Sequence, residues 1–311
     1  MRTRVIGLLI FTLCVLGTLA AVAVAAGRGS GPAGAPGLPL AGADAVALIK
    51  LDGTITDATV APYRSGRDRD NVYAQLQKAE HDDSIKAVVL RINSPGGSAA
   101  ASQAIYDQIR RIQARGKKVV AHLTDVAASG GYYVAAASDR IVSQPAALTG
   151  SIGVIITSMD LRGLYEKIGV QDRVIKSGPY KDILSPTRDM TPDEQAILEK
   201  LVQDTLDQFI KVVAEGRNLD EAEVRRIADG RVFSGKEALN LRLVDELGDQ
   251  HRAIQLAGEL SGLGKEPRVV LFEQPRSRVG LLDLLGSATS QLELDRLIPE
   301  PGIGVRYEWR G

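Results

Sequence analysis

Short apolar runs alternate with helical patterns along most of the chain. The runs AVALIKLDG, IKAVVLRI, KKVVAHL and DRIVS are rich in β-branched and aliphatic residues, and turn residues separate them, as is typical of buried strands. IGVIIT at 152–157 and DRVIK at 172–176 have the same composition. The pattern therefore predicts strands at all six places.

One helical pattern between these runs is especially clear. In AAASQAIYDQIRRIQARG, the side chains of Ile105, Ile109 and Ile112 share one face of a helix, and arginines occupy much of the rest. Strands that alternate with helices in this way favour an α/β fold with a largely parallel sheet.

The second half of the chain is mostly helical. In TPDEQ, Thr191 can cap a helix, Pro192 suits its first position and Glu194 completes a capping box, so we predict a helix to about Glu215. GRNLDEAEVRRIADG and SGKEALNLRLVDELG each predict a shorter helix. We find no internal repeat, so we expect one domain with a helical C-terminal part.

The chain begins with an apolar segment between a basic tail and a linker. Residues 1–4 are MRTR, and residues 5–26 carry no charge. A helix of this length is long enough to cross a bilayer core of about 30 Å. The basic tail should stay in the cytoplasm, which places the rest of the chain on the extracytoplasmic side of the cytoplasmic membrane as a single-pass protein. A cleaved signal sequence is the alternative.

The remaining boundaries follow from composition. Residues 27–43 are rich in Gly and Pro and should form a linker. We place the folded domain at 44–272 and a C-terminal extension at 273–311. An amphipathic stretch at 279–297 within this extension is interpreted as a packing or oligomer contact.

Charge and cysteine content exclude several classes of partner. Thirty-eight basic residues balance thirty-eight acidic ones, and no basic block is present, so we expect no nucleic-acid partner. The single cysteine, Cys14, cannot form an intramolecular disulfide. His, Cys, Asp and Glu show no metal-ligand spacing, so we expect neither a metal nor a cofactor.

Two glycine-rich junctions are candidates for chemistry. RINSPGGSAA places Gly97 between a strand and a helix, and DVAASGGYY places Ser129 and Gly130 in the same way. Such junctions leave backbone N–H groups unpaired, as an oxyanion requires, although one Gly-Gly pair alone is more often a plain tight turn. Two junctions in one parallel sheet lie at the same strand edge, where ligands of open α/β folds bind.

Four motifs in order carry a resemblance to a known family. INSPGG, AASGGYY, LTGSIGV and SGPYKDILSPTRDM resemble the short, single-domain bacterial form of signal peptide peptidase A over about 46–248. This resemblance implies the crotonase-like fold of the caseinolytic protease. It further implies that Ser129 is the nucleophile, Lys181 the general base, Gly97 and Gly130 the oxyanion-hole donors, and Ser151 a hydrogen-bond partner of the lysine amine.

Elementary chemistry agrees with a lysine base. The chain has only His81, His122 and His251, and none follows Ser129 before position 251, so a Ser-His-Asp triad is disfavoured. A lysine base must be neutral, which requires its pKa to fall from about 10.4 towards 7 or 8 by burial. The neighbouring Asp182 is tolerable only if adjacent side chains point to opposite sides.

The resemblance also implies an assembly and a substrate class. The serine and the lysine would come from neighbouring subunits of a ring, which we expect to be a homo-octamer. The expected function is a membrane-anchored serine endopeptidase that degrades remnant signal peptides and other unfolded apolar segments, with small or apolar residues beside the scissile bond. A catalytically inactive membrane scaffold and a crotonase-type acyl-CoA enzyme remain as alternatives.

Overall fold

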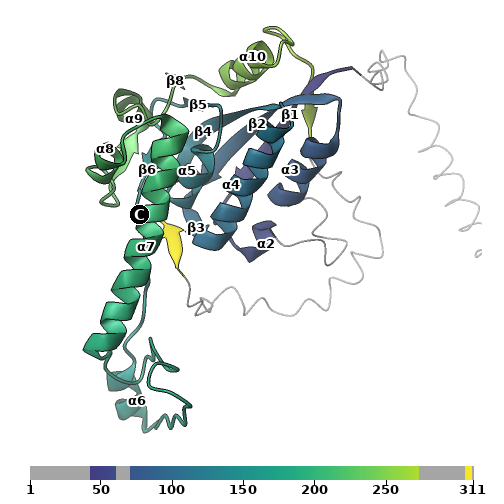
Figure 1. Ribbon diagram of the computed structural model, residues 1–311. Helices are drawn as coiled ribbons and strands as arrows, with labels where there is room; N and C mark the ends of the chain where they lie inside the picture. The colour runs from purple at the N-terminus through teal and green to yellow at the C-terminus, as the bar shows by residue number, and fades with distance from the viewer. Residues whose placement is uncertain (1–42, 61–70, 273–304, 310–311) are drawn as a thin grey trace, which may run out of the picture. The chain divides into compact units, whose positions relative to one another are not determined.

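The computed structural model describes residues 43–60, 71–272 and 305–309 (Figure 1). The predicted anchor at 5–26, the amphipathic stretch at 279–297 and nearly all of the predicted linker lie outside these residues. Among the described residues, no helix is long and apolar enough to cross a membrane. The predicted domain boundaries stay predictions.

A largely parallel sheet forms the centre of the described chain. Its strand order is β7-β6-β4-β2-β1-β9, with β5 paired to β4 and β8, and only the β6–β7 pair is antiparallel. The strands are β1 (Ala45–Asp52), β2 (Ile85–Ser94), β4 (Lys118–Ala128), β5 (Arg140–Ser143), β6 (Leu148–Gly150), β7 (Val232–Ser234), β8 (Glu246–Leu247) and β9 (Val269–Leu271). The predicted α/β class is confirmed.

Helices cover both faces of this sheet. They are α2 (Asp57–Val60), α3 (Val72–His81), α4 (Ala99–Ala114), α5 (Gly130–Ala135), α6 (Arg162–Ile168), α7 (Pro192–Arg217), α8 (Glu221–Arg225), α9 (Gly235–Asn240) and α10 (Gln250–Leu260). Alternate residues of β1 show how the faces separate. Ile49 and Leu51 join the core beneath α3 and α4, whereas Val46 and Leu48 pack in the cluster with residues of α10.

The helix predictions are confirmed where the capping signals are strongest. Thr191 accepts a hydrogen bond from the backbone N–H of Glu194 at 3.2 Å, and the Glu194 carboxylate accepts from the backbone N–H of Thr191 at 2.9 Å. This capping box starts α7, which ends close to the predicted end. In α4 the three isoleucines on the predicted face are fully buried.

Two of the six strand predictions are wrong. The segment 152–157 makes only an isolated bridge at Ile155, and the segment 172–176 has no strand pairing among the described residues. Val174 and Ile175 are both exposed. In the first segment, Ile152 accepts a hydrogen bond from Gly230 N–H and Ile155 bonds with Arg306, but these contacts do not continue into a strand.

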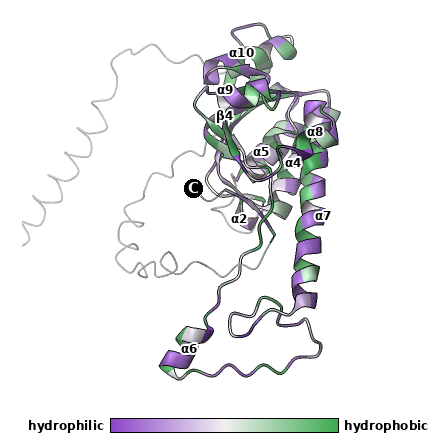
Figure 2. Ribbon diagram, turned by 90° about the vertical axis from the view of Figure 1, so that its left-hand side faces the viewer, coloured by the Kyte–Doolittle hydropathy of each residue, from purple (hydrophilic) through white to green (hydrophobic). Residues whose placement is uncertain are grey.

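Residues 156–190 form a segment that we call the arm. It contains α6 and lies beyond the N-terminal end of α7, away from β4 and α5 in both views (Figures 1 and 2). Eight of the large apolar side chains on the arm are at least 41% exposed: Met159, Leu164, Ile168, Val170, Val174, Ile175, Tyr180 and Met190. Ile197 and Leu201 of α7 are similarly exposed. Exposed apolar side chains gathered on one segment can mark an interaction site.

A small second sheet lies beside the junction at Gly97. It consists of β3 (Gly96–Ser98) and β10 (Arg306–Glu308), which pair antiparallel and bring the C-terminal residues next to a strand more than 200 positions earlier in sequence.

Candidate active site

Ser129 lies at the turn between β4 and α5. Its backbone angles are φ 53° and ψ −118°, a conformation that L residues rarely adopt and that costs about 1–3 kcal/mol. Two hydrogen bonds hold it there: its N–H donates to the carbonyl oxygen of Gly150 at 2.8 Å, and its carbonyl oxygen accepts from Tyr133 N–H at 2.8 Å. A sharp strand-to-helix turn of this kind presents a nucleophile at the edge of an α/β sheet.

The Ser129 hydroxyl is buried without a partner. The residue is 1% exposed, and its Oγ makes no hydrogen bond to any described residue. Leaving a buried hydroxyl unpaired costs free energy, so such groups are uncommon in folded proteins and mark candidate reaction centres.

Gly97 and Gly130 lie at the same corner as Ser129. Gly130 is the first residue of α5, where the N–H has no acceptor within the helix. A Cβ at Gly96 would stand 2.6 Å from the Gly130 nitrogen, and a Cβ at Gly97 would stand 2.1 Å from the carbonyl oxygen of Ile55. Both glycines of β3 have positive φ, so only residues without a side chain permit this close approach. The corner offers backbone donors for a developing oxyanion.

The C-terminal strand lies in this corner, which the sequence analysis missed. Tyr307 is opposite Gly97 in the antiparallel pairing, and its carbonyl oxygen stands 2.1 Å from where a Cβ of Gly96 would be. The same oxygen is 3.2 Å from the Cβ position of Gly130. The alternating pattern VRYEW at 305–309 is the sequence signal that predicts a strand here.

The side chain of Tyr307 fills an aromatic pocket. It is 1% exposed, stacks on Tyr133 with ring centroids 5.0 Å apart, and lies 4.7 Å from the ring of Phe209. Its hydroxyl donates to the carbonyl oxygen of Thr205 at 3.2 Å. α5 and α7 therefore build a pocket that accepts a large aromatic side chain with one polar end.

Ser151 lies at the same edge of the sheet as Ser129. It follows β6, whose last residue Gly150 pairs with Ala128 of β4. Ser151 is buried, has φ 49° and donates its N–H to the carbonyl oxygen of Arg231 at 2.8 Å. The main chain thus holds Ser151 close to the candidate nucleophile.

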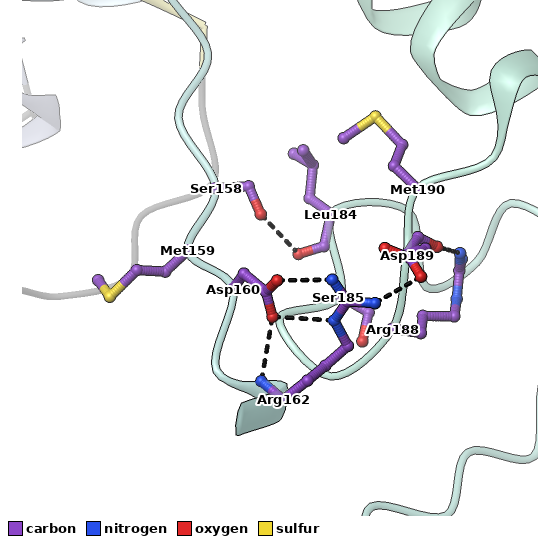
Figure 3. A pocket seen from close by; sticks show the side chains of 9 residues that line it. All are labelled: Ser158, Met159, Asp160, Arg162, Leu184, Ser185, Arg188, Asp189 and Met190. Carbon is purple, nitrogen blue, oxygen red and sulfur yellow. Dashed lines mark hydrogen bonds and ion pairs between the residues drawn. The ribbon is translucent and has the colours of Figure 1, made fainter. Parts of the chain in front are cut away.

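Lys181 is not brought to Ser129 within one chain. It is an exposed residue of the arm, and its backbone N–H donates to the carbonyl oxygen of Gly178 at 3.3 Å. The arm has its own cavity, formed around the ion pairs of Asp160 and Arg162 (Figure 3), and neither Ser129 nor the glycines of the corner line it. The structure therefore assembles four of the five predicted site residues and separates the fifth.

No histidine replaces the lysine. Because Ser129 Oγ has no partner among the described residues, none of the three imidazoles bonds to it. His122 is buried on β4, and its two ring nitrogens find no hydrogen-bond partner in the described chain. Burial lowers its pKa, and the positive charge of Arg91 lowers it further. His122 is therefore a packed residue of β4.

In the described part of the chain, no group of three His, Cys, Asp or Glu side chains could hold a metal ion. The absence of a metal and of a cofactor stays a prediction.

Comparisons with known proteins agree with the chemistry of this corner. A family model described as peptidase family S49 matches residues 111–264, and one described as Clp protease matches residues 63–149. The Synechocystis sp. protein slr0021, inferred to be a protease, is 40% identical over 248 residues, which cover 80% of this chain and 85% of that protein.

Two further relatives cover less of their own length. A protein of Enterococcus faecium, inferred to be signal peptide peptidase SppA, is 37% identical over 67% of this chain and 61% of its own. Protease 4 of Salmonella typhi is 35% identical over 82% of this chain but only 41% of its own. The sheet, the serine turn and these matches define a serine peptidase with a Clp-type α/β domain. The chain belongs to peptidase family S49.

Proposed function

We propose that this chain is a membrane-anchored serine endopeptidase that degrades remnant signal peptides and other unfolded apolar segments on the extracytoplasmic side. One observation carries the proposal. A strained, buried serine follows a parallel strand, and the carbonyl oxygen of Tyr307, in an extended peptide segment, lies 3.2 Å from the position that a Cβ of the next residue, Gly130, would occupy. A peptide carbonyl held at this corner would lie beside the serine and the start of α5, which supports attack on a peptide bond.

Ser129 is the proposed nucleophile and Lys181 the proposed base. Ser129 Oγ attacks the peptide carbonyl carbon while the neutral Nζ of Lys181 takes the hydroxyl proton. The N–H groups of Gly97 and Gly130 donate to the oxyanion. When the C–N bond breaks, the ammonium returns the proton to the leaving amine, and water then cleaves the acyl–serine ester by the same proton transfers. Ser151 would hold the amine through a hydrogen bond.

The proposed substrate is an extended peptide that pairs with β3 in place of β10. Strand addition of this kind uses main-chain hydrogen bonds, as in the bonds from Ala99 N–H to Val305 O at 3.3 Å and from Trp309 N–H to Pro95 O at 2.9 Å. The pocket that holds Tyr307 would select a large apolar or aromatic side chain. Of the small or apolar residues expected beside the scissile bond from the sequence, this pocket favours the large apolar ones.

Lys181 would reach Ser129 of a neighbouring subunit in a ring, which we propose is a homo-octamer. The exposed apolar side chains of the arm support this proposal, because a second copy could bury them. Lys181 would then enter a drier environment, which favours the neutral amine.

The proposed location rests on the sequence. The charge-free run at 5–26 after a basic tail supports a single-pass anchor in the cytoplasmic membrane. The name of the Enterococcus faecium relative supports signal peptides as substrates.

Labelling of full-length protein in detergent with a fluorophosphonate tests this function. We expect the wild type to be labelled at Ser129 and to hydrolyse a quenched apolar peptide containing tyrosine. Ser129→Ala should lower hydrolysis at least about 10³-fold, and Lys181→Ala should do the same. Ser138→Ala is the matched control, because Ser138 Oγ is also buried without a partner among the described residues.

Full activity of Ser129→Ala, or labelling elsewhere, would contradict the proposal. An unlabelled, inactive wild type would favour the scaffold, and turnover of an acyl-CoA would favour the crotonase-type enzyme.

A further inference from the structure

A carboxylate lies next to the proposed base in sequence. Asp182 follows Lys181, and a negative charge within about 4–6 Å of an amine favours its charged form, which cannot accept a proton. A lysine base in this position needs that carboxylate to be turned away and neutralised.

Arg188 meets both requirements. Its Nε donates to Asp182 Oδ2 at 2.9 Å and its Nη2 to Asp182 Oδ1 at 2.7 Å, a bidentate pair. Lys176 Nζ donates to the same Oδ1 at 2.7 Å. Arg188 first, and Lys176 second, hold the pKa of the Asp182 carboxyl well below its usual range. The Asp182 side chain is only 12% exposed, whereas its neighbour Lys181 is exposed.

The guanidinium of Arg188 also bonds the part of the arm that carries Lys181, here called the loop, to α7. Arg188 Nη1 donates to Glu194 Oε2 at 2.8 Å, and Nη2 donates to Glu194 Oε1. Glu194 is the residue that completes the capping box, and its side chain is 2% exposed. Hydrogen bonds, the largest of them from Arg188, lower the pKa of Glu194 to about 2, so this anchor is ionised at any working pH.

The two carboxylates that bond to Arg188 are matched by two cations, Arg188 and Lys176. The charged residues that bond within the loop or to it are Asp172, Lys176, Asp182, Arg188, Asp189, Arg162 of α6 and Glu194 of α7. Among the described residues, the structure gives Lys181 no ion pair with any carboxylate. Asp182 and Glu194 are already paired with Lys176 and Arg188, so neither carboxylate needs the Lys181 ammonium as a partner.

We propose that Arg188 is a positioning residue for the Lys181 base. It draws the Asp182 carboxylate towards α7 and neutralises it, and it fixes the loop that presents Lys181 to the neighbouring subunit. This inference rests on the proposed role of Lys181.

The pH dependence of kcat/KM in the full-length assembly tests the inference. Replacing Arg188 leaves the Asp182 charge only partly compensated, so Arg188→Gln should raise by about one unit the apparent pKa at which kcat/KM increases as Lys181 loses its proton. At about pH 6, well below that pKa, activity should fall about tenfold. Adding Asp182→Asn should return this increase in kcat/KM with pH, here called the limb, to its wild-type pH. Arg188→Lys keeps the charge and should shift the limb by less than about half a unit.

Arg162→Gln is the matched control. It removes an arginine from two carboxylates of the same arm, Asp160 and Asp189, without touching Asp182, so the limb should not move. Competitive acetylation of Lys181 across the pH range, in a Ser129→Ala background, reads the same shift without requiring activity.

If Arg188→Gln lowers kcat/KM by the same factor at every pH, and Asp182→Asn does not restore it, the inference is overturned, since the role of Arg188 would be purely structural. If Arg188→Gln does not assemble, the pH profile of Asp182→Asn tests the inference by itself. A shift of its limb to higher pH would contradict the inference. Retained activity of Lys181→Ala would instead refute the proposed function, whatever Arg188→Gln does.

Discussion

The backbone N–H of Ser129 donates a hydrogen bond to the carbonyl oxygen of Gly150 at 2.8 Å. This bond joins the ends of β4 and β6, and it places Ser151 one residue away from the acceptor. Ser129 and Ser151 both have positive φ, 53° and 49°. The positions of the candidate nucleophile and of the residue proposed to hold the amine are therefore set by the main chain, while Lys181, the proposed base, lies exposed on the arm.

Mixed assemblies test that separation. We expect Ser129→Ala and Lys181→Ala to be inactive alone. Co-expressed in equal amounts, they should recover about one quarter of the wild-type rate, because random mixing gives half of the sites an intact serine and half of those an intact lysine. The measurement is peptide hydrolysis by purified mixed assemblies. No recovery would mean that both residues of a site come from one chain.

The C-terminal strand should compete with substrate. Tyr307→Ala removes a fully buried side chain from its pocket, so β10 should leave β3 more readily and the KM for an added peptide should fall several-fold. Steady-state kinetics measure this. Trp309→Ala is the control, since the Trp309 side chain is only half-buried and the bond from its backbone to Pro95 remains. A higher KM for Tyr307→Ala would show that β10 helps rather than blocks binding.

Gly130→Ala should impair the chemistry more than the fold. Its Cβ would stand 2.5 Å from Ser102 Oγ and 3.2 Å from Gly96 Cα and Tyr307 O, so Ser102 or the start of α5 must move; we expect α5 to move, and a displacement of about 1 Å costs about 10²-fold in kcat. Gly163→Ala, where nothing lies within 4 Å of the added Cβ, should have the wild-type kcat. Unchanged kcat in Gly130→Ala would remove this residue from the oxyanion site.

His122 should make the protein less stable in acid. Its pKa is lowered in the folded state, so below about pH 6.5 the unfolded chain binds a proton that the folded chain does not. The melting temperature should fall from pH 7 to pH 5. His122→Leu should reduce that fall by about 2–4 °C, the shift that about 1 kcal/mol produces in a domain of this size. His251→Gln, on the exposed face of α10, should leave the fall unchanged.

The local signals in the sequence predicted most of the sheet and the start of α7. Four apolar runs are strands, and the capping box at Thr191 forms as expected. These features depend on residues that are near one another in sequence, so local patterns are enough to predict them.

The two wrong strands and the missed C-terminal strand β10 have a different origin. The apolar composition of Ile175 and its neighbours reflects a need for burial, but composition does not say against which surface. The pairing of Tyr307 with Gly97 joins positions far apart in sequence, and a short strand gives little pattern to recognise. Lys181 is exposed on the arm, so its proposed place beside Ser129 depends on contacts between chains, and no local pattern in the sequence predicts those contacts.

The backbone of Ser129 has an evolutionary consequence. Glycine adopts φ 53° and ψ −118° without steric penalty, so Ser129→Gly should fold at least as well as the wild type while losing all turnover. Selection for proteolysis alone then maintains serine at this turn. In gene copies released from that selection, we expect glycine to be the first replacement to spread.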